Sequence, residues 1–337
     1  MLRRAPGPRP RFPAACNTDP MAVTRVLHHV GADSLASTRS AFPDVEFVPV
    51  PTEGPLGDDV HGDVLLTTAI GGPNLSDVLQ RGVKWVHTIG TGVDRFPLDA
   101  VLPDQVLTCS RGASAIAISE WVLAVMLAFE KHVPDIWVDE APEHWFRLPG
   151  GITLGGLHRR RLAVLGMGSI GTEVARRALS FGMQVRGLRR TQRPIAELPE
   201  IEVVSNAIDA VADAHHIVVA APATAETEHL VDDALLRAVR PGAHLVNIAR
   251  GGLVDQEALR VALDDGRIAR ATLDVTTPEP LPADHWMFGH PSVRLSPHIS
   301  WSMPESYDLL YDTFRTNLAR WLEQRPLDGV VDIAAGY

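Results

Sequence analysis

The sequence predicts an α/β fold built from two doubly wound domains, each around a mostly parallel sheet. From residue 22 on, short apolar runs alternate with stretches of helical periodicity, which is typical of βαβ units. A glycine-rich turn at residues 166–171 stands between an apolar run and a helical stretch, as in dinucleotide-binding folds. The chain has 337 residues, which is enough for two domains of ordinary size.

The first domain is predicted from four apolar runs between residues 23 and 90. We expect buried strands in VTRVLHHV, VEFVPV, DVLLTT and KWVHTIG. The stretch LSDVLQRG between the last two predicts a helix whose start signal is Asn74 or Ser76. Residues 115–133, AIAISEWVLAVMLAFEKHV, predict a long helix that apolar residues nearly encircle. We therefore expect it to be buried, either between domains or in a subunit interface.

The second domain follows a segment without periodicity. Residues 134–161 contain two tryptophans, three prolines and four glycines, and we interpret them as an extended arm or linker. Six strand candidates come next, most of them separated by helical patterns: LAVLGMGSIG, MQVRGL, IEVV, HHIVVAAP, AHLVNIAR and RATLDV. This is the pattern of a complete doubly wound sheet. The final stretch, PESYDLLYDTFRTNLARWLEQ, predicts an amphipathic helix.

Composition restricts the class of protein. The formal net charge is −10 and the pI is near 5.8, which disfavours binding to a nucleic-acid backbone. The only cysteines are Cys16 and Cys109, so we expect neither a disulfide framework nor a cysteine-rich metal site, and no metal. No apolar run is long enough to predict a membrane span. The Arg- and Pro-rich opening lacks the apolar segment of a secretory signal. We therefore expect a cytoplasmic enzyme whose residues 1–21 are a disordered leader, or an extension upstream of a start at Met21.

The glycine turn has the spacing G-x-G-x-x-G, with glycines at 166, 168 and 171. RLAVL before it predicts a strand and TEVARRALSFG after it predicts a helix, which is the context that the motif requires. The first glycine permits the tight turn, the second lets a pyrophosphate approach, and the third lets helix and strand pack closely. We expect a pyrophosphate to bind this turn: Gly166, Met167, Gly168, Ser169, Ile170 and Gly171. The alternative is a glycine-rich turn without a ligand.

The end of the next strand, MQVRGLRRT, indicates which dinucleotide binds. An acidic residue at this place accepts hydrogen bonds from the ribose of NAD(H). Here the place holds Arg189, Arg190 and Thr191, and no acidic residue occurs before Glu197. Guanidinium groups suit a phosphate dianion. We therefore expect NADP(H) to be preferred, with NAD(H) possible; the alternative is a solvated basic loop.

Polar residues follow three of the predicted strands in the second domain. Arg250 follows AHLVNIA, Asp274 ends RATLD with Glu279 five residues later, and His298 follows VRLSP. Considered one at a time, each residue has a simpler interpretation: Arg250 as a surface charge, Glu279 as a solvated loop residue and His298 as a structural histidine. Hydride transfer to a 2-oxo acid, however, needs a cation for the carboxylate, a proton donor and a group that keeps the donor protonated. Arg250, His298 and Glu279 fill these roles.

Seven stretches in the same order make the chain resemble a known family. They are IGTGVD (89–94), ISEWVLAVMLA (118–128), VLGMGSIG (164–171), PATAETEHL (222–230), NIARGGLVDQEAL (247–259), LDVTTPEPLP (273–282) and SPHIS (296–300). From about residue 23 to 330 the chain resembles the D-isomer-specific 2-hydroxyacid dehydrogenases, and is similar to their glyoxylate/hydroxypyruvate reductases.

The resemblance implies a role for each matching position. Arg250 binds the substrate carboxylate and polarises the carbonyl, while His298 donates the proton in reduction and accepts it in oxidation. Glu279 pairs with His298 and favours its imidazolium form. Backbone amides around Thr91 and Gly92 bind the carboxylate from its other side. The remaining positions are implied to contact the cofactor, with Asp274 at its nicotinamide end: Asp274, Pro222, Thr227 and Ile248.

The resemblance also implies a domain organisation and an assembly. A flavodoxin-like substrate-binding domain comprises residues 22–112 and 303–337, and a Rossmann cofactor domain comprises residues 113–302. The active site is implied to lie in the cleft between them, with hinge closure excluding water. A homodimer through the cofactor domain is expected. Trp145 is either an arm residue that reaches the partner's active site or an interface aromatic.

Departures from the family pattern narrow the function. Ser110-Arg111-Gly112 stands where many relatives begin with Asn, at a domain crossing. The loop TTAIGGPN has no Lys, Arg or Tyr, which counts against a phosphorylated substrate, and Glu279 stands where the formate-oxidising branch has Gln. We expect a reductase of small 2-oxo acids such as glyoxylate, hydroxypyruvate or phenylpyruvate-like compounds. The alternatives are a nicotinamide-sensing, corepressor-like binding protein and another oxidoreductase such as a phosphite dehydrogenase.

Overall fold

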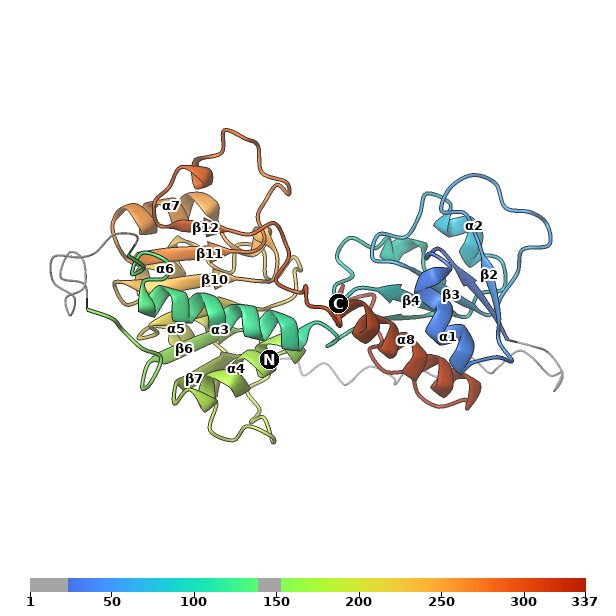
Figure 1. Ribbon diagram of the computed structural model, residues 1–337, viewed down its shortest axis with the longest axis horizontal. Coiled ribbons are helices and arrows are strands. Elements are labelled where there is room, and N and C mark those ends of the chain that lie inside the picture. Colours follow the sequence, from blue (N-terminus) through green and yellow to red (C-terminus); the bar gives the residue numbers. More distant parts are fainter. Residues whose placement is uncertain (1–23, 139–152) are drawn as a thin grey trace, which may run out of the picture. The chain divides into compact units, whose positions relative to one another are not determined.

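The computed structural model describes residues 24–138 and 153–337, which divide into two compact units (Figure 1). The first unit contains the residues up to Ala113 together with Tyr307–Tyr337, and the second contains Ser114–Ser306. Each unit has one sheet in which all strand pairs are parallel. The α/β class with two parallel sheets, predicted from the alternating pattern, is confirmed.

The first unit has a five-stranded sheet in the order β2-β1-β3-β4-β5, the flavodoxin-like strand order. The four apolar runs singled out in the sequence contain the first four of its strands, and β5 lies beyond them. The bounds are β1 Arg25–His28, β2 Glu46–Pro49, β3 Val64–Thr68, β4 Trp85–Ile89 and β5 Val106–Cys109, with helices α1 Ala36–Ala41, α2 Leu75–Leu79 and α8 Ser306–Leu322.

The last helix, α8, completes the first unit by covering one face of this sheet. Phe314 of α8 is fully buried and stacks on Trp85 of β4 with ring centroids 5.5 Å apart. Arg315 donates a 3.0 Å hydrogen bond to the Ser37 hydroxyl of α1, which lies beside α8 (Figure 1). The opposite face packs against α2, which Asn74 precedes as its N-cap. The end of the chain is therefore an integral part of the unit that its beginning forms.

The second unit has a seven-stranded sheet in the order β12-β11-β10-β9-β6-β7-β8, which is the Rossmann order extended by one strand. Helices α3 and α4 cover one face, and α5, α6 and α7 cover the other. The strands are β6 Arg161–Leu165, β7 Gln184–Leu188, β8 Glu202–Val204, β9 His216–Val219, β10 Ala243–Asn247, β11 Ile268–Leu273 and β12 Val293–Leu295. The helices are α3 Ala115–Lys131, α4 Ser169–Ser180, α5 Ala207–Val211, α6 Asp233–Ala238 and α7 Gln256–Asp264.

Helix α3 is buried on one face only. Val122 and Met126 have no exposed surface, whereas Ile116 is 43% exposed and Ala124 is also exposed. Within this unit the helix therefore presents an uncovered, largely apolar face, in which Glu120 lies between Ile116 and Ala124 and pairs with Arg177 of α4. No helix in residues 24–138 and 153–337 is long and apolar enough to cross a membrane.

Two of the sequence predictions concern parts of the chain outside the described residues. The leader at residues 1–21 and Trp145 of the arm are not among them. Where the 134–161 segment is described, at 134–138 and 153–160, it contains neither helix nor strand.

Candidate active site

Arg250, Asp274 and His298 follow neighbouring strands of the second sheet. Arg250 comes three residues after β10, Asp274 directly after β11, and His298 three residues after β12. Because β10, β11 and β12 are adjacent and parallel, all three residues lie at the carboxyl edge of the sheet. This is the edge at which ligands of open α/β sheets bind.

His298 and Glu279 are in direct contact. His298 Nδ1 lies 3.1 Å from Glu279 Oε2, and about a third of each side chain is exposed, at 38% and 34%. The imidazole Nε2 has no hydrogen-bond partner among the described residues. A histidine whose Nδ1 is held by a carboxylate and whose Nε2 is open can exchange a proton with a ligand through Nε2.

The backbone of His298 adopts a left-handed conformation, with φ of 55°. Such a conformation is costly for a residue with a side chain, and it persists only where the surroundings impose it. The His298 amide donates to the Asp274 carbonyl at 2.9 Å, and the His298 carbonyl accepts from Trp301 Nε1 at 3.0 Å. The imidazole therefore projects from a turn whose two ends are both fixed.

The buried carboxylate of Asp274 fixes this turn by accepting hydrogen bonds from it. It accepts hydrogen bonds from the Ser296 hydroxyl at 2.5 Å and from the amides of Ile299 and Ser300 at 2.9 and 3.0 Å, and Asp274 is 1% exposed. The structure thus gives Asp274 a positioning role for His298 that its place in the sequence does not reveal. Contact between Asp274 and a nicotinamide ring stays a prediction.

Arg250 lies in a turn that a second buried residue braces. Asn247 ends β10 and is 1% exposed; its Nδ2 donates to the Arg250 carbonyl at 2.9 Å, and its Oδ1 accepts from the Ala249 amide at 3.0 Å. The Arg250 guanidinium donates to the Ala249 carbonyl at 2.6 Å. The sequence predictions missed Asn247, although an asparagine immediately before such a turn is a common turn signal.

A glycine brings the Arg250 turn into contact with the loop that carries Glu279. A Cβ on Gly251 would lie 2.0 Å from the carbonyl carbon of Thr276, so only glycine permits the two backbones to approach this closely. The side-chain amide of Gln256 also donates to the Thr277 carbonyl. The structure therefore joins the Arg250, Glu279 and His298 loops into one group, although 48 positions separate the first from the last.

The glycine turn after β6 fits an anionic ligand. Gly166 has φ of 112°, and a Cβ on it would lie 2.5 Å from the Ala221 amide nitrogen. A Cβ on Gly171 would lie 1.9 Å from the Gly166 carbonyl oxygen, whereas the same position on Gly168 is open. Helix α4 begins at Ser169 and Gly168 supplies no side-chain cap, so the first amides of α4, including that of Ile170, stay available to a phosphate.

The other predicted cofactor residues surround this turn in two ways. Met167 and Ile248 are 7% and 5% exposed and belong to one apolar cluster beneath it. The hydroxyl of Thr227 donates to the Pro222 carbonyl at 2.6 Å and closes the loop after β9. The apolar pair and the closed loop both border the space above the sheet edge, and neither contributes a charged group to it.

The end of β7 is the basic part of this edge. Arg189, Arg190 and Thr191 are all exposed. Arg190 Nη2 lies 3.1 Å from Glu226 Oε2 of the loop after β9, in an ion pair that is well exposed on both sides. An exposed pair of this kind contributes little to stability, so it leaves Arg190 able to exchange partners.

Thr91 and Gly92 lie in the first unit, in the turn after β4. The Gly90 carbonyl accepts from the Ser110 amide at 2.8 Å, and the Thr91 carbonyl accepts from the Cys109 thiol at 3.7 Å. In a trans peptide the N–H points opposite to the carbonyl of the same unit, so the Thr91 and Gly92 amides point away from β5. Neither amide donates a hydrogen bond within the described part of the chain. Two such donors side by side suit a carboxylate.

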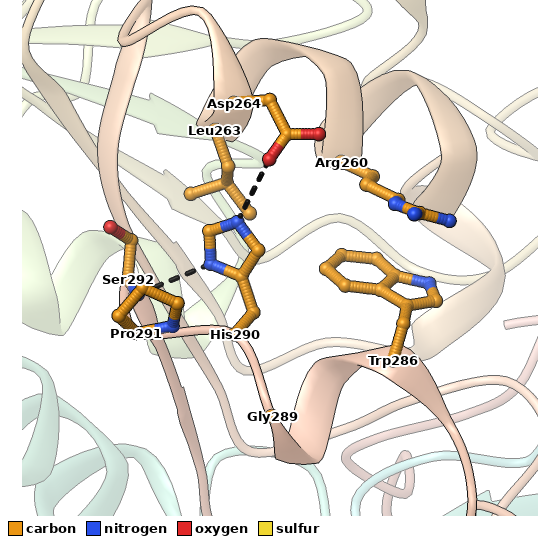
Figure 2. Close-up of a pocket in the computed structure, with 8 residues that line it drawn as sticks. All are labelled: Arg260, Leu263, Asp264, Trp286, Gly289, His290, Pro291 and Ser292. Atoms are coloured by element: carbon orange, nitrogen blue, oxygen red, sulfur yellow. Dashed lines mark hydrogen bonds and ion pairs between the residues drawn. The ribbon is translucent and has the colours of Figure 1, made fainter.

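A pocket of about 440 Å³ lies elsewhere in the second unit, between the end of α7 and the start of β12 (Figure 2). This is the amino edge of the sheet, opposite to Arg250 and His298. His290, in its wall, accepts from the Ser292 amide at 3.1 Å through Nδ1 and contacts Asp264 at 3.3 Å through Nε2. Both ring nitrogens are engaged, so this pocket lacks the open nitrogen that distinguishes His298.

Comparison with known proteins agrees with the geometry of the second unit. The family model described as "D-isomer specific 2-hydroxyacid dehydrogenase, NAD binding domain" matches residues 123–300, which is more than half of the chain. The chain belongs to this family. The membership expected from the seven sequence motifs is confirmed, and it is a family of NAD(P)-dependent oxidoreductases.

Two curated proteins and one solved structure illustrate the similarity. This family member is 34% identical over 246 residues to glyoxylate/hydroxypyruvate reductase B of Pectobacterium atrosepticum, covering 71% of this chain and 77% of that one. It is 34% identical over 237 residues to the chloroplastic D-3-phosphoglycerate dehydrogenase 3 of Arabidopsis thaliana, covering 68% of this chain but only 39% of that one. A D-isomer specific 2-hydroxyacid dehydrogenase from Xanthobacter autotrophicus, solved with NADPH and MES, superposes with a TM-score of 0.78 at 25% identity, covering 94% of this chain and 100% of that one.

Proposed function

We propose that this dehydrogenase-family protein reduces small 2-oxo acids to D-2-hydroxy acids with NADPH. The observation that carries the proposal is the 3.1 Å contact between His298 and Glu279, at the same sheet edge as Arg250 and the glycine turn. These groups are a proton donor, its counter-ion, a cation for the carboxylate and an anion-binding helix start. Reduction of a 2-oxo acid requires all four.

Each side chain has one task in this mechanism. The glycine turn and the start of α4 would hold NADPH, which would supply the hydride for the carbonyl carbon. Arg250 binds the substrate carboxylate and, through the same planar group, withdraws electron density from the carbonyl oxygen. His298 transfers its Nε2 proton to that oxygen as the negative charge develops. Glu279 holds the imidazole by Nδ1 and offsets its charge, and the Thr91 and Gly92 amides supply further donors to the carboxylate.

The structural features of the first unit favour a small, unphosphorylated acid. The end of β3 and the loop that joins it to α2, residues 67–74, have no cationic side chain that could bind a substrate phosphate. This is consistent with the similarity to glyoxylate/hydroxypyruvate reductase B over most of that protein's length. Initial velocities with NADPH against glyoxylate, hydroxypyruvate, pyruvate, 2-oxoisocaproate and phenylpyruvate test the proposal. Cofactor binding without turnover of any of these acids would contradict it and would favour a nicotinamide-sensing role.

The preference for NADPH has its own test in the arginines after β7. We expect Arg189→Ser and Arg190→Ser each to raise the KM for NADPH by about tenfold or more. A hydrogen bond between charged groups contributes about 1.5–3 kcal/mol, and each variant removes one such partner of the 2′-phosphate. The KM for NADH should change less than about twofold, because NADH lacks this phosphate. Steady-state kinetics with both cofactors measures the ratio.

The control for this experiment is Arg237→Ser, which removes an exposed arginine from α6, away from the β7 edge. It should leave both KM values unchanged. An equal rise in the KM for NADPH and NADH in the two β7 variants would assign Arg189 and Arg190 to the protein surface, and NAD(H) would then become the expected cofactor.

A homodimer through the second unit is also part of the proposal. The uncovered face of α3 includes Ile116 and Ala124, and partly exposed Trp121, Val125 and Ala128 extend it. Apolar helix faces of this extent are usually covered by another chain. We expect Ala124→Arg to convert the dimer to a monomer, because a charged side chain in the middle of such an interface loses its hydration without gaining a partner. Sedimentation velocity measures the change.

Val261→Arg serves as the matched control for the dimer. Val261 is a 54% exposed apolar residue of α7, on the opposite face of the same sheet from α3. This variant should sediment as the wild type does. If Ala124→Arg stays dimeric, the interface lies elsewhere than on α3.

A further inference from the structure

His87 is a buried histidine that the proposed reaction does not use. It lies in the middle of β4, three residues before Gly90, and has no exposed surface. Burial lowers the pKa of His87 to about 3, so its imidazole is neutral at physiological pH. A neutral imidazole has one donor and one acceptor nitrogen, so it can form a hydrogen bond on each side of the ring.

Hydroxyl groups contact both ring nitrogens of His87. Ser110 Oγ and Thr313 Oγ1 lie 3.3 and 3.4 Å from His87 Nε2. Both hydroxyls also donate to the Leu310 carbonyl of α8, at 3.1 and 2.6 Å. His87 Nε2 therefore contacts two hydroxyls that α8 also holds.

The other ring nitrogen completes a continuous chain of hydrogen bonds. Trp85 Nε1 donates to Thr108 Oγ1 at 2.8 Å, and Thr108 Oγ1 lies 2.8 Å from His87 Nδ1 and 3.3 Å from the Val86 carbonyl. From His87 the chain continues through Ser110 to the Leu310 carbonyl of α8. Every side chain in it is satisfied, and together they tie β4, β5 and α8 to one another.

Ser110 connects this chain to the turn that carries the carboxylate-binding amides. Its hydroxyl is held between His87 and Leu310, while its own amide donates to the Gly90 carbonyl at 2.8 Å. The Gly90 carbonyl and the Thr91 N–H belong to one planar peptide unit. The orientation of the Thr91 donor therefore depends on the position of Ser110, and hence on His87.

We propose that His87 is a positioning residue that, through Ser110, orients the Thr91 amide toward the substrate carboxylate. The inference rests on the proposed 2-oxo acid reductase activity, because that activity is what gives the amide an anion to bind. The Ser110 hydroxyl, which contacts both His87 and the Leu310 carbonyl, anchors this segment to α8.

If His87 only filled the core, its replacement would lower the stability of the protein. It would not raise the KM for the 2-oxo acid while leaving the KM for NADPH unchanged. The test therefore compares His87→Leu, which removes both hydrogen bonds, with His87→Gln, whose amide retains a donor and an acceptor. Ser110→Ala removes the hydroxyl but keeps the backbone amide, and it disturbs the fold less than either. Thr88→Val is the matched control, because Thr88 is the next residue of β4, points to the other sheet face, and has a buried hydroxyl without a partner in the described residues.

We expect His87→Leu and Ser110→Ala to raise the KM for the 2-oxo acid about tenfold, the loss that follows when one hydrogen bond to a charged group is misaligned. The KM for NADPH should stay within about twofold of wild type in both. His87→Gln should recover most of the loss, and Thr88→Val should show none. Melting temperatures measured on the same samples separate misfolding from misorientation, and Ser110→Ala carries the test if His87→Leu does not fold.

Isothermal titration with oxalate, in the presence of NADP⁺, gives a second readout that does not need turnover. Oxalate presents a carboxylate beside a second planar C–O group, as a 2-oxo acid does. A wild type that binds oxalate but turns over no 2-oxo acid would contradict the proposed function alone, and the oxalate Kd of the variants would still decide the inference. Three outcomes would overturn the positioning role of His87. The first is an equal rise in the KM for NADPH and the KM for the 2-oxo acid. The others are an unchanged 2-oxo acid KM or oxalate Kd in Ser110→Ala, and no oxalate binding by the wild type.

Discussion

Replacing Arg250 with alanine should lower kcat/KM for the 2-oxo acid by about 10²–10³-fold, the range seen when one donor to a developing oxyanion is removed. Arg250 is the cation of the carboxyl-edge group, and its turn is braced by Asn247 and packed through Gly251 against the Glu279 loop. The substitution removes carboxylate binding and carbonyl polarisation together, so both kcat and KM should worsen. Steady-state kinetics at saturating NADPH measures the loss.

Arg250→Lys should recover little of this activity. A lysine ammonium keeps the charge but lacks the planar arrangement of donors that contacts a carboxylate and an adjacent carbonyl at once. Arg260→Ala is the control, because Arg260 lies over the Trp286 ring in the pocket at the opposite sheet edge (Figure 2). That variant should have wild-type kinetics. A kcat/KM near the wild-type value in Arg250→Ala would remove Arg250 from the mechanism.

The parts of the molecule that the sequence predicts well depend on local patterns. Each apolar run singled out in the sequence contains a strand, because the period of a buried strand and its flanking turns can be read within ten residues. The role of Gly171 is similarly local, since a Cβ there would meet the Gly166 carbonyl of the same turn, whereas a Cβ on Gly166 would meet Ala221, which follows β9. Strand ends then locate Arg250 and His298, because parallel strands place their carboxyl ends at one edge.

The parts that could not be predicted depend on contacts between distant segments. The Asp274 carboxylate caps a turn more than twenty residues later, and nothing near Asp274 in the sequence identifies Ser296, Ile299 and Ser300 as its partners. The link from His87 to Leu310 joins residues over two hundred positions apart. Pairings of this kind follow from how elements pack, and hydrophobic periodicity carries no information about them.

The uncovered face of α3 likewise depends on packing that the local sequence does not reveal. Its composition predicts a helix buried all round, and the prediction allowed for a subunit interface as the cover. The second unit by itself buries only the side with Val122 and Met126. Only another chain could cover the exposed side. The apolar composition of the helix can indicate that such a chain binds, but it cannot identify that chain.

Replacing His298 with glutamine should lower kcat for reduction by about 10²–10⁴-fold, the contribution of a positioned general acid. Glutamine retains a hydrogen-bonding side chain of similar length but cannot act as a general acid. The affinity for NADPH should stay near that of wild type, because the glycine turn lies at a different strand of the sheet. Rapid mixing that follows hydride transfer in a single turnover separates this loss from slow product release.

Glu279→Gln tests the partner of the donor and should affect the two directions of the reaction differently. The amide oxygen of the introduced glutamine can still accept from His298 Nδ1, so the imidazole keeps its orientation, but the negative charge that offsets the imidazolium is gone. Reduction requires the protonated ring and oxidation requires the neutral one. The variant should therefore lose more of its kcat for reduction than of its kcat for oxidation, and steady-state kinetics in both directions measures the two losses.

The contrast between the two directions distinguishes an electrostatic role of Glu279 from a merely structural one. A Glu279→Gln variant whose turn is disordered would lose reduction and oxidation in equal proportion, because a misplaced imidazole transfers protons poorly in both directions. A variant that keeps the His298 turn, fixed by Asp274 and Trp301 rather than by Glu279, should show the asymmetric loss. The ratio of the two kcat losses thus shows whether the 3.1 Å contact acts on the proton or only on the orientation of the ring.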